Sequence, residues 1–410
     1  EKFFSENLYV INYNALNFIT SKFYISIGDL IYLSFFIILL ITLFNFFLNK
    51  KKNLIKIILN FLSFFSVLFF FFHLVWGMNY YRVPLHNKIN LKTDFNLNQL
   101  SKTLNILVKK SNDLHSKLTA NDSIPVYVPY DLNTVSRIIE RDFKFYEYSK
   151  KFKPKIKNSL FSNVLSFMGF SGYINPFTLE AQINMKIPKL NYITTASHEM
   201  AHQLGISNES EANYVAFISS INNNDPFIKY AGYIFALKYC YNDLYNKNKD
   251  LAIEIFSKLN IGIIKNFKED NSFWKKHKNP IEPYLKKMYG LFLKSKGQTK
   301  GIETYNQLVK YVISYFESNN YKWKISKLKK ITSNNNLLIK KIKILQKKSS
   351  QRKKNKSFVV EGYKEIEKAL KNKYKIESLF TSENSILLDS NKKNSLSKYI
   401  ENCFIVKSEL

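Results

Sequence analysis

Two histidines and a glutamate in the middle of the chain form the pattern H-E-x-x-H. They are His198, Glu199 and His202. Residues four apart lie on one face of a helix, so both imidazoles can reach one ion. Imidazole is a good ligand for Zn2+, and catalytic zinc keeps one coordination position open. Glu199 is then placed to act as general base toward a water molecule that the metal polarises. The pattern predicts a Zn2+ site with His198 and His202 as ligands and Glu199 as the catalytic residue.

The alternative to this metal site is a surface helix with two unrelated histidines. Only six histidines occur in the 410 residues, so a chance match to the pattern is rare. The context also fits a helix that positions the ligands. Thr194 or Thr195 can start it, and Gly205 can end it in a left-handed turn that folds the chain back toward the metal.

The third ligand is expected shortly after His202, among Asn208, Glu209 and Glu211. An amide is a poor zinc ligand beside a carboxylate, which sets Asn208 aside. The two glutamates are roughly 200° apart around a helix, so they cannot both face one ion. Glu209 shares its face with Asn213, which could hydrogen-bond a ligating histidine. Glu211 suits a capping box at the helix start, although its apolar face also makes it a rival ligand. We predict Glu209 as the third ligand, with Glu211 as the runner-up.

The segment from Phe167 to Asn184 precedes the metal helix and predicts a glycine turn followed by a strand. In zinc peptidases a strand at this place often forms the edge against which the substrate lies. We therefore expect Phe177, Thr178 and Glu180 to contact the substrate. An ordinary hairpin is the alternative.

Two uncharged, strongly apolar stretches, Leu30–Leu48 and Ile57–Trp76, have the length needed to cross a bilayer. They predict a transmembrane hairpin, with buried core helices as the alternative. The lysines between them, Lys50 to Lys52, favour a cytoplasmic loop. This orientation places the residues after Trp76 outside the cytoplasm.

The composition is strongly basic, with a net charge of +31 and a pI near 9.7. This charge indicates an anionic partner such as lipid headgroups or nucleic acid, or else the lysine-rich drift of an AT-rich genome. The two cysteines provide no disulfide framework. Because the sequence begins with Glu1 rather than Met, we expect it to be a fragment at its N-terminus.

The expected fold is mainly α with a small β component, in three parts. Residues 1–84 form the membrane region, residues 85–325 a zincin-like α+β metallopeptidase domain, and residues 332–410 a small, truncated α/β domain. Within the second part we expect a helix at Leu97–Leu118 and a strand at Ile124–Val128.

Several motifs together resemble the bacterial membrane family known as domain of unknown function 3810. They are W-G-x-N-Y-x-R-x-P at Trp76–Pro84, S-G-Y-x-N-P-F-T-x-E-A at Ser171–Ala181, H-E-x-A-H-Q-x-G at His198–Gly205, E-x-E-A-N at Glu209–Asn213 and G-x-x-x-Y at Gly301–Tyr305. The resemblance covers roughly residues 20 to 320 and implies a metallopeptidase. The family normally begins with one further membrane helix.

The last eighty residues instead resemble the start of SpoU-type RNA ribose 2′-O-methyltransferases, a small domain that binds the RNA substrate. A basic helix carries Lys340, Lys341, Lys347, Lys348 and Arg352, and the run F-V-V-E-G follows. We expect the basic residues to bind RNA, a strand at Ser357–Val360, a helix at Tyr363–Leu370 and a strand at Ile376–Phe380. The chain ends before any knotted cofactor domain, so methyl transfer is not expected from it. A basic, partly disordered tail is the alternative.

The sequence thus predicts a zinc metallopeptidase anchored in a bacterial inner membrane, with its catalytic domain outside the cytoplasm and a peptide or protein as substrate. An RNA-binding domain outside the cytoplasm conflicts with that orientation, which points to two neighbouring genes joined in one reading frame. The alternative function is such a fusion or read-through product, with a structural or inactive metal site and an RNA-binding C-terminal part.

Overall fold

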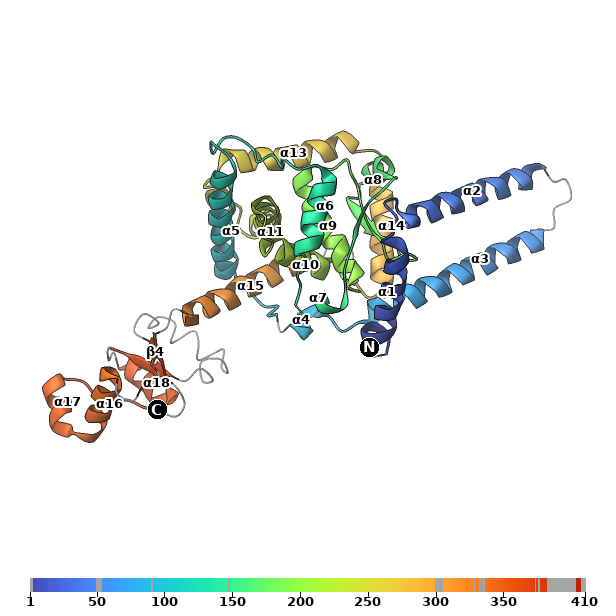
Figure 1. The fold of residues 1–410 in the computed structure, drawn as a ribbon. Helices are drawn as coiled ribbons and strands as arrows, with labels where there is room; N and C mark the ends of the chain where they lie inside the picture. Colours follow the sequence, from blue (N-terminus) through green and yellow to red (C-terminus); the bar gives the residue numbers. More distant parts are fainter. Residues whose placement is uncertain are drawn as a thin grey trace. The chain divides into compact units, whose positions relative to one another are not determined.

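The computed structural model divides the chain into two compact units, residues 1–315 and 316–410. The structure describes residues 3–48, 54–89, 91–146, 148–298, 305–326, 329–331, 333, 336–372, 374, 377–381 and 403–406. The fold is mainly α with a small β component, as predicted (Figure 1).

The first unit is a helical body with one small sheet. Its elements in chain order are η1 (Phe4–Leu8), α1 (Tyr9–Thr20), α2 (Ile27–Leu48), α3 (Leu54–Val75), η2 (Gly77–Tyr81), α4 (Leu85–Lys88), α5 (Leu97–Leu118), α6 (Leu132–Asp142), α7 (Tyr148–Lys151), β1 (Ile156–Asn158), α8 (Ser162–Met168), β2 (Gly172–Ile174), β3 (Ala181–Ile183), α9 (Lys189–Gln203), α10 (Glu209–Ile221), α11 (Pro226–Lys247), α12 (Lys249–Phe256), α13 (Ile261–His277), α14 (Glu282–Ser295) and α15 (Tyr305–Ser326), which continues past residue 315.

The sheet of this unit has the strand order β1-β3-β2. β1 runs parallel to β3, and β2 runs antiparallel to it, with Gly172 opposite Ile183. Strand β2 therefore lies at one edge of the sheet. The segment 167–184 forms β2 and β3 where the sequence predicted a glycine turn and a strand.

Helices α2 and α3 are long and apolar enough to cross a membrane. The candidate spans are Ile27–Asn45 and Ile57–Val75, with mean hydropathies of 2.4 and 2.2, close to the spans predicted from the sequence. The two helices project from the body (Figure 1). The rings of Phe35 on α2 and Phe64 on α3 meet edge to face 5.7 Å apart. The lysines predicted to form the loop between them lie outside the described residues.

The start of α2 is fixed to the body by a buried carboxylate. Glu180 accepts hydrogen bonds from the backbone N–H of Ile27 at 3.2 Å and of Gly28 at 2.6 Å. A carboxylate at a helix N-terminus satisfies N–H groups that have no helical partner and favours the helix dipole, an effect of up to about 2 kcal/mol when partly buried. Asp29, also buried, accepts from the Tyr173 hydroxyl on β2 at 2.5 Å.

The core of the body forms where α9 packs against α10, α11 and β3. Helix α5 covers α11 and begins with a capping box, in which Asn96 and Gln99 exchange hydrogen bonds of 2.9 Å. Its buried Leu100, Leu104 and Leu107 recur at helical spacing, which is why the polar sequence Leu97–Leu118 forms the predicted helix.

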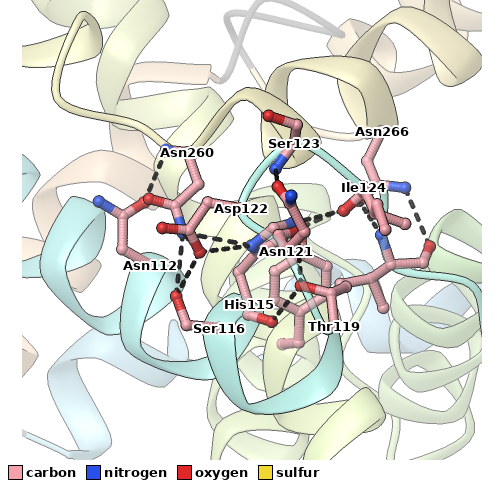
Figure 2. Close-up of polar contacts among 12 residues, drawn as sticks. Asn112, His115, Ser116, Thr119, Asn121, Asp122, Ser123, Ile124, Asn260 and Asn266 are labelled. Carbon is pink, nitrogen blue, oxygen red and sulfur yellow. Dashed lines mark hydrogen bonds and ion pairs between the residues drawn. The ribbon is translucent and has the colours of Figure 1, made fainter.

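The strand predicted at Ile124–Val128 is wrong, because a side chain takes its backbone hydrogen bonds. Asn266 of α13 accepts from Val126 N–H at 3.1 Å and donates to Val126 C=O at 3.0 Å. The same loop is held by buried His115, whose Nε2 donates to the Ile124 carbonyl at 2.9 Å, and by Asn260, whose amide donates to Asp122 at 2.8 Å (Figure 2).

The second unit has a parallel sheet of order β4-β6-β5, built from β4 (Lys329–Ile331), β5 (Leu379–Thr381) and β6 (Cys403–Val406). Its helices are α16 (Leu337–Lys347), α17 (Ser349–Asn355) and α18 (Tyr363–Lys371). β4 lies just before residue 332, where the sequence places the start of this part.

The strand predicted at Ser357–Val360 is wrong. Lys356 has a positive φ of 48°, and Ser357 N–H bonds back to the Arg352 carbonyl at 3.3 Å. This left-handed turn ends α17, and the four residues after it are not in a strand. The strand predicted at Ile376–Phe380 corresponds in part to β5, while Ile376 lies outside the described residues.

Candidate metal centre

Helix α9 begins at Lys189, earlier than the predicted start at Thr194 or Thr195. Pro188 is the N-cap, and its fixed φ suits the start of a helix. Thr194 lies inside the helix, where its hydroxyl bonds the Asn191 carbonyl. The end is as predicted, since Gly205 has a φ of 77° and turns the chain toward α10.

The predicted ligands His198, His202 and Glu209 come together where α9 meets the start of α10. The Nε2 of His198 lies 3.2 Å from Glu209 Oε2 and 3.1 Å from His202 Nε2. His202 Nε2 lies 3.9 Å from Glu209 Oε1. All three ligand atoms lie within 4.8 Å of one another, a spacing that can hold a metal ion.

The second nitrogen of each histidine has its own acceptor. His198 Nδ1–H donates to Asn213 Oδ1 at 2.8 Å, the contact that the sequence suggested for Asn213. His202 Nδ1–H donates to the Ile206 carbonyl at 2.6 Å. Placing both protons on Nδ1 leaves the lone pairs of both Nε2 atoms free to bind a cation, and such partners fix ligand orientation.

Glu211, the runner-up ligand, faces away from the triad. Its Oε1 accepts from His86 Nδ1 at 3.1 Å and from His86 N–H at 3.3 Å. The capping box expected for Glu211 is also wrong, because Asn208 caps α10 by accepting from the N–H of Ser210 and Glu211. The roughly 200° between positions 209 and 211 explains why one carboxylate reaches the histidines and the other does not.

Two aromatic side chains from distant parts of the chain complete the surroundings of the triad. The Tyr289 hydroxyl on α14 donates to Glu209 Oε1 at 2.8 Å. The ring of Trp76 stands edge to face on His202, with centroids 5.9 Å apart. Sequence reasoning missed Tyr289, because nothing in the spacing of α14 connects it to residues eighty positions earlier.

Burial and neighbouring charges give the three ligands different pKa values. For His198 burial acts to lower the pKa, but its bond to Glu209 and the charges of Glu199 and Glu209 raise the pKa to about 9. For His202 burial prevails and lowers the pKa to about 4. For Glu209 burial acts to raise the pKa, but the bond from His198 and the histidine charges lower it to about 2. At neutral pH Glu209 is therefore anionic and His202 a neutral imidazole, while His198 must release one proton before its Nε2 can bind a cation.

Glu199 lies beside the triad on α9 and is buried. Its Oε2 makes no hydrogen bond to any part of the chain that the structure describes. Burial raises the pKa of its carboxyl to about 8, although the charge of His198 opposes the shift. A buried polar atom without a partner next to three convergent donors is what a bound metal and its water would satisfy. The residues present therefore fit a metal ion with two nitrogen donors and one oxygen donor.

Gly172 on the edge strand β2 packs closely against Glu199. A Cβ at this position would lie 2.9 Å from the Gln182 carbonyl oxygen and 3.0 Å from Glu199 Cγ. Only glycine lets the strand approach the metal helix so closely. This packing accounts for the glycine in the motif Ser171–Ala181.

Glu199 and the triad line a cavity of about 1460 Å3, together with Gly172, Tyr173, Ile174 and Pro176. The predicted substrate contacts Phe177, Thr178 and Glu180 are not among its lining residues. Thr178 and Glu180 are buried and bond each other at 2.9 Å, and Glu180 caps α2. Substrate contact by these three residues stays a prediction, and the cavity places their neighbours on β2 nearer the metal.

The basic residues predicted to bind RNA differ in their exposure to solvent. Lys340, Lys341, Lys347 and Lys348 are exposed. Arg352 is half-buried and donates to the carbonyls of Leu345 at 2.8 Å and Gln346 at 3.0 Å, which ties α17 to the end of α16.

Comparisons with known proteins agree with both resemblances. No curated protein and no solved structure matches the chain. Residues 336–409 match the family described as MRM3-like substrate binding domain. Residues 4–313, well over half of the chain, match the family described as Protein of unknown function (DUF3810), and the chain therefore belongs to that family.

Proposed function

We propose that this protein is a membrane-anchored zinc metallopeptidase. The observation that carries the proposal is the convergence of His198, His202 and Glu209 beside Glu199, whose buried oxygen has no partner in the described chain. Two histidines and a glutamate are one of the ligand sets of catalytic zinc. Helices α2 and α3 support the anchoring, because they are long and apolar enough to cross a bilayer.

Zinc, when bound, supplies a Lewis acid that polarises a peptide carbonyl and makes water acidic. The chain supplies the proton transfers. Glu199 in its ionised form takes a proton from the attacking water on one carboxylate oxygen, and the protonated carboxyl then donates that proton to the leaving amine. Burial raises the pKa of this carboxyl, and a cation held by the triad would lower it again, which favours the ionised form that accepts the proton.

The outer edge of β2, which pairs with no other strand among the described residues, is suited to align the substrate. An extended peptide can add to a sheet edge through backbone hydrogen bonds. Gly172, Tyr173 and Ile174 of β2 line the same cavity as Glu199, so a peptide paired there would have its backbone next to the base.

The decisive experiment replaces Glu199 by Gln. The amide keeps the volume of the side chain but cannot act as a base. Zinc content should remain at one ion per chain, while cleavage of a peptide library should fall by at least about a hundredfold, the usual lower bound for losing a general base. Metal analysis and mass spectrometry of the products measure the two effects.

A matched control is Glu254→Gln, which changes an exposed carboxylate far along the chain and should alter neither property. Cleavage by Glu199→Gln at the rate of the unchanged protein would sink the peptidase proposal and leave a structural metal site.

A second function is proposed for the C-terminal unit, which we expect to bind RNA. The match of residues 336–409 to a substrate-binding domain favours it, and four exposed lysines support it. Methyl transfer is not proposed for this chain. The joining of two genes in one reading frame accounts for a membrane peptidase and an RNA-binding unit in the same polypeptide.

A further inference from the structure

The cavity over the metal triad extends to the apolar helices. Tyr32, Leu33 and Phe36 of α2 line it, and so do Phe72 and Trp76 at the end of α3. Residues of both helices therefore border the same space as His198 and Glu199. Its volume of about 1460 Å3 exceeds the roughly 300–1,000 Å3 of ordinary small-molecule sites, so it has room for a polymeric or apolar segment beside the metal.

Two of the α2 residues that line the cavity are exposed. Leu33 is 40% exposed and Phe36 is 56% exposed, and they lie three positions apart on one helix face. An opening of the cavity at these side chains, with Tyr32 beside them, would present a mainly apolar border to a substrate that arrives from the bilayer.

Helix α2 and the edge strand β2 are joined at this opening. The ring of Tyr32 stacks on Tyr173 of β2, with centroids 6.1 Å apart and an angle of 21° between the planes. The hydroxyl of Tyr173 is anchored to Asp29 of α2. Only the stacked pair Tyr32 and Tyr173 separates a peptide paired with β2 from the face of α2 that lines the cavity.

We propose that the substrate is a membrane-spanning peptide that is cut in an extended segment directly next to its apolar helix, which lies against Leu33 and Phe36 of α2. This inference rests on the proposed peptidase activity. The edge of β2 recognises main chain, so the part of the substrate that continues into the hydrocarbon is also polypeptide. Polypeptide in hydrocarbon must be helical to satisfy its backbone groups.

Two anchored peptides test the proposal in vesicles that contain the zinc-loaded protein. Both carry the same cleavable sequence and the same apolar helix. In the first peptide the cleavable sequence directly adjoins the apolar helix. In the second peptide a flexible Gly/Ser spacer of about 20 residues, roughly 25 Å in r.m.s. length, separates the cleavable sequence from the helix. The two peptides have equal surface concentration. The adjoining peptide should be cut at least about tenfold faster, because the spacer uncouples the scissile segment from the helix in the opening.

A matched pair of substitutions locates the opening on α2. Leu33→Trp places bulk at the cavity, and Ile38→Trp places the same bulk on the opposite side of the helix, where residue 38 does not line the cavity. The first should reduce the rate ratio of the two peptides toward one, and the second should leave it unchanged. Equal cutting of the two peptides by the unchanged protein, or equal behaviour of the two variants, overturns the proposal.

A binding experiment separates this inference from the peptidase activity. Glu199→Gln protein treated with a chelator is mixed in vesicles with an adjoining peptide that carries a photoreactive group in its apolar helix. Cross-links should map to α2 around Leu33 and Phe36. Cross-links together with no hydrolysis by the zinc-loaded protein would contradict the peptidase function but support the binding site on α2. Cleavage of peptides without such cross-links would support the peptidase function but contradict the proposal that the substrate spans the membrane.

Discussion

Glu209 and Glu211 are two positions apart in the chain and have different partners. Glu209 faces the two histidines and accepts from Tyr289, whereas Glu211 faces His86. The turn of the helix, rather than the chemistry of the side chain, decides which carboxylate reaches the metal.

This geometry leads to opposite expectations for two alanine variants. Glu209→Ala removes one of three ligands and should weaken zinc binding by several orders of magnitude. Glu211→Ala should keep zinc and lower stability by about 1 kcal/mol, the usual net contribution of one hydrogen bond. Zinc titration against a competing chelator measures the first effect, and thermal unfolding measures the second. Retention of zinc by Glu209→Ala with loss by Glu211→Ala would reverse the assignment.

At the level of residues, the sequence predicts what helical spacing controls. The positions of His198, Glu199 and His202 follow from one pattern, and Asn213 follows from lying one turn after Glu209. Tyr289 could not be predicted, because α14 reaches the triad only through the tertiary packing of the body. The burial of Glu180 was likewise invisible, since its partners are backbone groups of α2, more than 150 positions earlier.

At the level of elements, the junction between α2 and the body depends on Glu180. It caps the first turn of α2 and also accepts from Thr178, while it is 2% exposed. One side chain thereby connects an apolar helix with the loop that leads into β3.

Glu180→Ala should therefore destabilise the protein by about 2–4 kcal/mol, because buried N–H groups at the start of α2 lose their acceptor. Thermal unfolding in detergent measures the loss. Glu254→Ala, which removes one member of an exposed ion pair with Lys258, should change stability by less than about 0.5 kcal/mol. Equal effects of the two variants would show that the cap at α2 is unimportant.

Elements with strong hydrophobic periodicity can be predicted from this sequence. Elements whose ends or backbone hydrogen bonds depend on a competing residue elsewhere cannot. The apolar stretches become α2 and α3, and Leu97–Leu118 becomes α5. The expected strand near Val126 fails because Asn266 takes its backbone bonds, and the start of α9 is misplaced because Pro188 serves as N-cap. Neither competition can be read from local sequence.

At the level of the whole molecule, both functional regions follow α3 in the chain. No helix after α3 in the described residues meets the length and hydropathy of a membrane span.

RNA binding should reside in residues 316–410 and should depend strongly on salt. Lysine–phosphate contacts release counterions, so affinity should fall steeply between about 50 and 200 mM salt. Binding of structured RNA to the full chain in detergent measures this dependence, with the chain ending at residue 315 as control. Lys340→Ala with Lys341→Ala should reduce the slope. Affinity that is independent of salt, or retained by the shortened chain, contradicts the assignment.

If α2 crosses a bilayer, we expect its capped start to make the metal triad sensitive to bilayer thickness. The candidate span Ile27–Asn45 has 19 residues and is about 28 Å long, close to a hydrocarbon core of about 30 Å. In a thinner bilayer the helix would be too long for the hydrocarbon core, and a helix relieves this hydrophobic mismatch by tilting. Because Glu180 and Tyr173 hold its first turn, a change of tilt pulls on the strand beside Glu199. We therefore expect the length of the lipid chains to affect the site through the tilt angle of α2.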